Sequence, residues 1–190
     1  MIDQLLNWDI QLFLWLNGLG QPSYDFIWLL LSEKATNVVV YLIFVFAYAN
    51  RYGARAAFFL FASAAILVGM TDQITNVFKY GFMRLRPCHT PELDGLMRLV
   101  KDSCGGKFSF FSGHSSNSFA LAIYFSLMFA RMKWLKPILI LFAGCIAYSR
   151  VYLGVHFPLD ILCGALAGSL LGYTFFKTIN SYFKKVLPTY

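Results

Sequence analysis

Charged residues are scarce in this sequence, and acidic residues are fewer than basic ones. Of the 190 residues 13% are charged, with nine Asp and Glu against 16 Lys and Arg. Soluble domains carry about 25% charged residues, so this deficit excludes an ordinary soluble domain. The formal charge of +7 does not indicate a nucleic-acid partner. The cations lie between apolar runs, and no basic tail or stripe is present.

Internal repeats, low-complexity segments and a cleavable signal peptide are also missing. The chain begins MIDQLLNWD, which is acidic where a signal peptide is basic, and no small-residue cleavage site follows. At this length we expect a single domain that covers residues 1–190.

Apolar and aromatic residues take the place of the missing charges. The sequence is 58% hydrophobic and contains 20 Phe, 11 Tyr and four Trp. A hydrocarbon core of about 30 Å requires roughly 20 apolar residues per helix, and several stretches meet that length. We therefore predict an all-α integral membrane bundle with five or six transmembrane helices and an N-terminal interfacial helix. The five predicted spans cover about residues 37–50 with the turns before them, 55–78, 115–131, 135–152 and 158–177.

The N-terminal segment has a different pattern from the spans. In residues 2–17 apolar side chains recur at helical spacing around Asp3, Asn7, Asp9 and Gln11, which predicts an amphipathic helix in the membrane interface. An extra span over residues 8–32 is the alternative that the sequence leaves open.

The positions of the cations predict the orientation. One side of the predicted bundle has no Asp or Glu, and the positive-inside rule assigns it to the cytoplasm. Its cations are Arg51, Arg55, Arg131, Lys133, Lys136, Lys177, Lys184 and Lys185. The loop of about residues 80–113 then lies outside. Its own cations, Arg84, Arg86, Arg98, Lys101 and Lys107, weigh less because long loops contribute little to the rule.

The four cysteines divide between this loop and the spans. Cys88 and Cys104 lie in the loop, where a disulfide would add about 3 kcal/mol of stability. We favour this bridge over two free thiols. Cys145 and Cys163 lie inside spans and are expected to be packing residues.

Three polar clusters flank the outer ends of the predicted spans. They are Lys79 to Arg86-Pro87, Ser112-Gly113-His114, and Ser149-Arg150 with His156 and Asp160. Because the spans alternate in direction, all three fall on one membrane face. Each cluster alone is weak, since a single Lys or Arg near a span end is usually an interfacial anchor. Together and in this order they indicate a site.

The residue types in these clusters suit a bound phosphate. Lys79, Arg86 and Arg150 supply cations, and guanidinium groups pair with phosphate oxygens through two hydrogen bonds. Ser112 supplies a hydroxyl, and the backbone N–H groups of Gly113 and His114 open a helix, where anions bind.

Two histidines are candidates for chemistry. Asp160, four residues after His156, would orient that ring for nucleophilic attack on phosphorus. His114 would act as the general acid. His89 is expected to be a loop residue, Asp72 a hydrogen-bond partner inside the bundle, and the His and Cys spacing does not predict a zinc site.

The three clusters, in this order, resemble the type 2 phosphatidic acid phosphatase (PAP2) family. Its pattern is Lys-x6-Arg-Pro, then Pro-Ser-Gly-His, then Ser-Arg-x5-His-x3-Asp, and the likeness covers about residues 60–176. The resemblance implies that His156, His114 and Asp160 are catalytic, and that catalysis needs no metal or other cofactor. It further implies that Lys79, Arg86, Ser112, Gly113 and Arg150 bind phosphate. One departure is Phe111, where the family usually has Pro.

The expected function is hydrolysis of a lipid phosphate ester or pyrophosphate through a phosphohistidine. The expected partners are the bilayer and its lipid phosphates, at the outer face of a bacterial inner membrane. Undecaprenyl pyrophosphate, phosphatidylglycerol phosphate, phosphatidic acid and lipid A phosphates remain open as substrates. A lipid phosphotransferase and a non-catalytic lipid-binding or transport protein are the alternatives.

Overall fold

The chain folds into a bundle of helices. The computed structural model describes residues 1–101 and 103–186, and for residues 183–186 the backbone alone. Within these residues the β-type pairing is limited to one isolated bridge between Leu85 and Phe108. The helices are α1 Ile2–Gly18, α2 Asp25–Ser32, α3 Lys34–Tyr52, α4 Ala54–Phe82, α5 Gly113–Met128, α6 Leu135–Tyr152 and α7 Pro158–Val186. The predicted all-α membrane bundle is confirmed.

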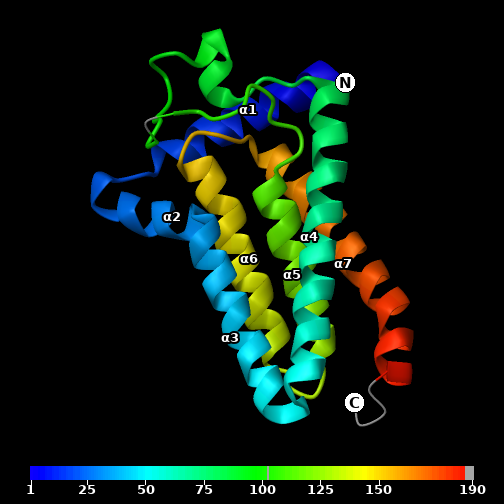
Figure 1. Cartoon of the computed structure of the whole chain (residues 1–190). Coiled ribbons are helices and arrows are strands. Elements are labelled where there is room, and N and C mark those ends of the chain that lie inside the picture. Colours follow the sequence, from blue (N-terminus) through cyan, green and yellow to red (C-terminus); the bar gives the residue numbers. More distant parts are fainter. Residues whose placement is uncertain (102, 187–190) are drawn as a thin grey trace.

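Helices α3 to α7 run side by side, while α1 lies across one end of the bundle (Figure 1). The long loop between α4 and α5 lies at the same end as α1, and the turn between α3 and α4 lies at the opposite end. The cations Arg51, Arg55, Arg131, Lys133 and Lys136 all belong to connections at that opposite end or to the first turn next to one. The side chains of Lys184 and Lys185 lie outside the described residues.

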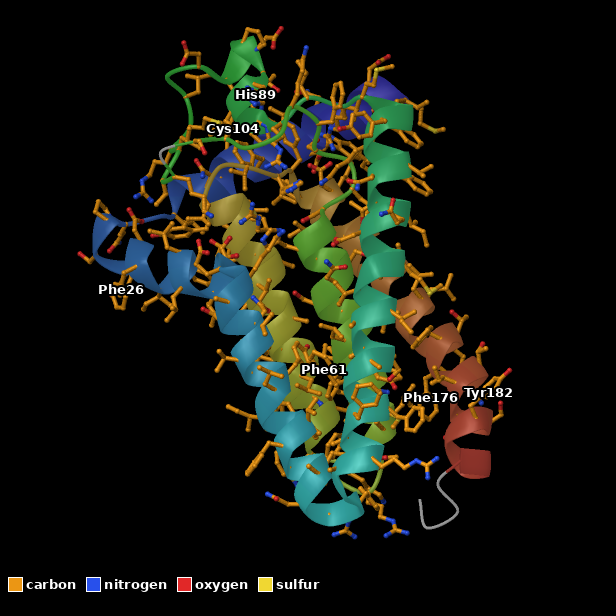
Figure 2. The ribbon with its side chains drawn as sticks, in the orientation of Figure 1. Phe26, Phe61, His89, Cys104, Phe176 and Tyr182 are labelled. Atoms are coloured by element: carbon orange, nitrogen blue, oxygen red, sulfur yellow. A yellow bond between two sulfur atoms is a disulfide. The ribbon has the colours of Figure 1, made fainter. Side chains whose placement is uncertain are left out.

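The outer surface of the bundle is apolar. Large side chains such as Phe26, Phe61 and Tyr182 project from it (Figure 2), and each is about half exposed or more. Exposed apolar surface on this scale is expected where lipid replaces water as the solvent.

In the part of the chain that the structure describes, fewer helices than the five or six predicted spans have the length and composition of a membrane span. Among the described residues three helices are long and apolar enough to cross a membrane: α4, α6 and α7 over Pro158–Tyr182. A fourth span results if Pro22–Ser32 and Lys34–Tyr52, which are bent by 56° at their break, count as one. The predicted fifth span corresponds to α5, which has 16 residues and ends at Met128 rather than near residue 131. It is shorter than a typical span and lies between α4, α6 and α7.

No continuous helix covers residues 8–32, so the alternative of an extra span there is wrong. Helix α1 ends at Gly18, and a short 3₁₀ turn at Pro22–Tyr24 separates it from α2.

The polar face that we predicted for α1 is only partly correct. Asp3, Asn7 and Gln11 are exposed, but Asp9 is 4% exposed and buried against the bundle. The buried face of α1 consists of Asp9, Phe13 and Asn17, which recur every four residues. Tryptophans at positions 8 and 15 are instead 62% exposed. The helix therefore packs on the bundle through a mixed polar and apolar stripe and presents aromatic rings outward.

Three glycines of α7 bring its backbone into contact with α5. A Cβ atom at Gly164 would lie 2.7 Å from the carbonyl oxygen of the α5 N-cap, Ser112. At Gly168 or Gly172 it would lie 2.1 or 2.4 Å from a carbonyl oxygen of α5 itself. These glycines are spaced four residues apart, so they form one stripe along α7. Such a stripe permits close helix association in membranes, where apolar burial alone contributes little.

We expect Gly168→Ala to destabilise the protein by about 1–3 kcal/mol, because the clash is with backbone that cannot rotate away. The measurement is the apparent melting temperature in detergent. The control is Gly144→Ala on α6, where a Cβ atom meets nothing within 4 Å. Equal melting temperatures for the two variants would contradict the proposed close contact of α5 and α7.

Candidate active site

The turn between α6 and α7 carries the predicted nucleophile. Gly154 has a φ of +79° in this turn, and the carbonyl of Arg150 accepts hydrogen bonds from the N–H groups of Val155 and His156 at 3.0 and 3.2 Å. Pro158 then begins α7. These constraints fix His156 two residues before the start of α7, and its side chain is 1% exposed.

Asp160 lies one helical turn from His156 and faces it. Its Oδ2 is 3.4 Å from His156 Nδ1 and accepts a shorter bond of 2.9 Å from the backbone N–H of Phe157. The His–Asp contact is therefore long, as catalytic hydrogen bonds often are without substrate. The contact leaves Nε2 as the ring nitrogen that faces away from the carboxylate. Ser109, in the long loop, lies within interaction range of both residues, and its Oγ donates to the carbonyls of Leu85 and Arg84 at 3.0 and 3.3 Å.

The other oxygen of Asp160 is paired with Arg84. Nη1 of Arg84 donates to Asp160 Oδ1 at 3.0 Å, and Nη2 donates to Asp9 Oδ2 at 2.6 Å. The guanidinium group also lies over the Phe157 ring, 4.1 Å from its centroid. One arginine thus joins α1, the α4–α5 loop and α7 next to His156.

Three cations surround His156. Burial lowers the pKa of its imidazole well below the ordinary value, and the positive charges of Arg86, Arg150 and Lys79 lower it further. His156 is consequently neutral over the physiological range, as a nucleophile must be. The three cations predicted from separate motifs therefore lie around one histidine.

Both arginines of this group are nearly buried. Arg86 donates to the carbonyls of Cys104 and Phe108 at 2.9 and 3.3 Å, and its burial lowers its pKa. Arg150 donates from Nη1 to Ser32 of α2. Its Nε is buried without a hydrogen-bond partner among the described residues. Buried guanidinium groups with spare donors are suited to an anion.

The Ser112-Gly113-His114 motif begins α5 beside this group. Ser112 caps the helix and accepts from the N–H of Ser115 at 3.4 Å, and its own N–H donates to the Asp160 carbonyl at 3.0 Å. His114 lies in the first helical turn, within electrostatic range of Arg150 and His156. Phe111, which replaces the usual Pro, is buried and packs on Phe78 with ring centroids 5.0 Å apart.

The long loop is held in place by backbone hydrogen bonds between its two ends and by a disulfide. The N–H groups of Arg86 and Ser109 donate to Lys107 and Arg84 carbonyls at 3.1 and 2.8 Å. Cys88 and Cys104 form a disulfide with Cα atoms 6.0 Å apart. Figure 2 shows Cys104 and His89 in this loop at the α1 end of the bundle.

Two other polar residues lie apart from the histidine pair. His89 is exposed in a 3₁₀ turn at Pro87–His89. Asp72 accepts a hydrogen bond of 2.8 Å from Asn117 of α5, which is the bundle contact that we predicted for it. Among the described residues no group of three or more His, Cys, Asp or Glu side chains could hold a metal ion.

Sequence reasoning missed Asp9, Arg84, Ser109 and Ser32. From the sequence alone, Arg84 is a loop cation and Asp9 belongs to the polar face of an interfacial helix. One available signal was the spacing of Asp9, Phe13 and Asn17, which places two polar residues and an aromatic on one helix face.

The fold and the arrangement of the site are typical of a membrane-embedded enzyme that acts on phosphate esters. Comparisons with known proteins identify the family. The PAP2 superfamily matches residues 59–184. This chain belongs to the PAP2 superfamily and is a membrane lipid phosphatase that hydrolyses phosphate esters.

Two curated relatives and one solved structure cover most of the chain. Proteins named lipid A 4'-phosphatase from Porphyromonas gingivalis and Bacteroides thetaiotaomicron are each 33% identical to it. Their alignments cover 93% of this chain and 75% and 79% of the relatives. The crystal structure of Aquifex aeolicus LpxE is similar with a TM-score of 0.68 and 26% identity, over 88% of this chain and 94% of that one.

We expect the paired substitution of Cys88→Ser and Cys104→Ser to lower the stability by about 3 kcal/mol and to raise KM more than it lowers kcat. The loop carries Arg86, a predicted phosphate ligand, which donates to the Cys104 carbonyl at 2.9 Å. Loosening the loop is therefore expected to weaken phosphate binding. The measurements are the apparent melting temperature and steady-state kinetics in detergent. The matched control is Cys145→Ser with Cys163→Ser, because both thiols are free in the bundle. If both pairs behave alike, the disulfide does not stabilise the site.

Proposed function

We propose that this protein removes a phosphate group from lipid A through a phosphohistidine on His156. The reaction takes place at the outer face of the bacterial inner membrane. The observation that carries the mechanism is the buried His156–Asp160 pair, with Arg86, Arg150 and Lys79 around it. The observation that favours lipid A is that two relatives named lipid A 4'-phosphatase align with 93% of the chain.

In the first step Nε2 of His156 attacks phosphorus and the bond from phosphorus to the ester oxygen breaks. The proton on Nδ1 stays directed at Asp160, which compensates the positive charge that the ring gains. His114 takes up a proton as the dianionic phosphate binds beside it, because the negative charge favours the imidazolium form. It then donates this proton to the leaving alkoxide, and the dephosphorylated lipid departs.

In the second step the now neutral His114 accepts a proton from water, and the resulting hydroxide attacks the phosphorus. The bond from phosphorus to Nε2 breaks, and inorganic phosphate is released. Arg86, Arg150 and Lys79 stabilise the charge on the equatorial oxygens in both steps. Ser112 and the backbone N–H groups at the start of α5 add hydrogen bonds to the same oxygens.

We place the site at the outer face of a bacterial inner membrane. Arg51, Arg55, Arg131 and Lys133 lie at the opposite end of the bundle, and the positive-inside rule assigns that end to the cytoplasm. The Cys88–Cys104 disulfide supports this orientation, because disulfides persist in an oxidising compartment.

The test is phosphate release from a panel of lipids by detergent-purified protein, with a chelator present. The panel contains lipid A, undecaprenyl pyrophosphate, phosphatidylglycerol phosphate and phosphatidic acid. We expect lipid A to be hydrolysed with the highest kcat/KM. His156→Ala should lose about a thousandfold or more in kcat, because the nucleophile is removed. His89→Ala is the matched control and should retain wild-type activity, since His89 is exposed outside the motifs.

Each contrary result identifies a different error. Full activity of His156→Ala would contradict the phosphohistidine mechanism, and loss of activity in the chelator would contradict metal-free catalysis. A preference for another lipid in the panel would contradict the substrate assignment alone. Transfer of phosphate to an added alcohol in place of its release would identify a phosphotransferase. An inactive wild type would favour a lipid-binding protein.

A further inference from the structure

We propose that Asp9 of α1 is a positioning residue for the reaction, which acts on Asp160 and His156 through Arg84. The inference rests on the proposed phosphohistidine function. It extends that site to the N-terminal helix, which contains none of the family motifs and lies outside the residues that the PAP2 superfamily matches.

The contacts form a continuous chain from α1 to the nucleophile. Asp9 Oδ2 accepts from Arg84 Nη2 at 2.6 Å, and Arg84 Nη1 donates to Asp160 Oδ1 at 3.0 Å. Asp160 Oδ2 then lies 3.4 Å from His156 Nδ1. The second oxygen of Asp9 accepts from the N–H of Leu159 at 2.8 Å, in the first turn of α7. Asp9 thus contacts both the arginine that holds Asp160 and the backbone next to Asp160.

The two carboxylates are buried, which distinguishes this contact from a surface ion pair. The side chains of Asp9, Asp160 and Arg84 are 1%, 0% and 18% exposed. Surface pairs contribute little because water and salt screen them. Removing one member of a buried pair leaves an uncompensated charge, so its effect on neighbouring groups is large.

The rest of α1 fixes Asp9 in place. Phe13, one turn further on, is fully buried and packs on the Phe157 ring with centroids 5.3 Å apart. Asn17 donates to the carbonyls of Val151 and Tyr152 at 3.1 and 3.0 Å, at the end of α6. The buried stripe of α1 therefore packs along the turn that carries His156, and Asp9 is the member of the stripe that connects to Asp160, through Arg84.

Charge explains why a second carboxylate is useful here. Asp160 must carry negative charge to compensate the imidazolium that forms on His156. Arg84 alone would neutralise Asp160, and Arg86, Arg150 and Lys79 add three further positive charges around the histidine. Burial raises the pKa of the Asp9 carboxyl group, and the Arg84 guanidinium opposes that rise. With both carboxyl groups ionised, the Asp9–Arg84–Asp160 group carries one net negative charge. Asp9 therefore holds Arg84 in position and offsets its charge.

The key variant is Asp9→Asn, which retains an oxygen that can accept from Leu159 but loses the charge. We expect kcat on the lipid that the wild type hydrolyses best to fall about 10- to 100-fold, the loss that is typical when a hydrogen-bonding partner behind a metal ligand is removed. KM should change less than about twofold, because the phosphate-binding cations are untouched. Asp9→Glu should recover part of the activity. Asp3→Asn, on the same helix but exposed, is the control and should behave as wild type.

A double-substitution cycle separates this role from a general structural one. Because Asp9 acts through Arg84, Asp9→Asn combined with Arg84→Gln should lose no more kcat than Arg84→Gln alone, within about twofold. Losses that multiply would show that Asp9 acts independently of Arg84 and would overturn the proposal. A wild-type kcat for Asp9→Asn would overturn it as well. The proposal would also be overturned if Asp9→Asn melted at or below the assay temperature, because unfolding would then explain the lost activity.

Nuclear magnetic resonance of ¹⁵N-labelled histidine tests the same inference without turnover. The chain has three histidines, so the His156 signals can be assigned by substitution. In the wild type we expect the neutral ring to carry its proton on Nδ1, toward Asp160, and in Asp9→Asn we expect a larger fraction of the Nε2–H tautomer. An unchanged tautomer ratio would overturn the positioning role. This result stands even if the lipid panel finds no substrate, so failure of the proposed function remains distinguishable.

Discussion

The close contact between α5 and α7 is the constraint on which the rest of the site depends. Gly164 and Gly168 let the two backbones approach so closely that a Cβ atom at either position would overlap a carbonyl of α5 or of its N-cap residue. At the end of this contact next to the α6–α7 turn, the N–H of Ser112 donates to the carbonyl of Asp160 at 3.0 Å. That single bond joins the Ser-Gly-His motif to the His-x3-Asp motif. Motifs that are far apart in the sequence therefore meet in space because the backbones of α5 and α7 lie in contact.

Electrostatics then determines what this arrangement can bind. Arg86, Arg150 and Lys79 act together on His156, and the buried Nε of Arg150 has no partner among the described residues. Charges in such a setting are costly unless an opposite charge accompanies them, and in the proposed function the phosphate group of the substrate supplies that charge. The carboxylates of Asp160 and Asp9, in contrast, lie on the Nδ1 side of the His156 ring. Asp160 and Asp9 share Arg84 on the side of His156 away from Nε2. In the proposed mechanism, negative charge at this position supports the nucleophile without repelling the phosphate.

Much of this could be predicted from the sequence, because apolar runs and motif spacing are local signals. Span positions follow from hydropathy, and the motif order with alternating helix directions predicts one shared face. The prediction was less accurate for helix α5, which is shorter than the predicted span. It is surrounded by other helices, so an apolar run there does not imply a full crossing. The Asp9–Arg84–Asp160 group could not be predicted, since its members are separated by 75 and 76 residues. Asp9 also follows an interfacial tryptophan, so composition alone places it on an exposed face. Only the packing of α1 shows that Asp9, Phe13 and Asn17 face inward.

The central claim is that His156 carries the phosphoryl group during turnover. The most direct measurement is rapid alkaline quenching of the protein during hydrolysis of a lipid labelled with ³²P, followed by digestion and peptide mapping. The account predicts a label on the peptide that contains His156, stable in alkali and lost in mild acid, as expected for a phosphorus–nitrogen bond. A label on another residue, an acid-stable phosphoester, or full turnover with no labelled protein at any quench time would contradict it.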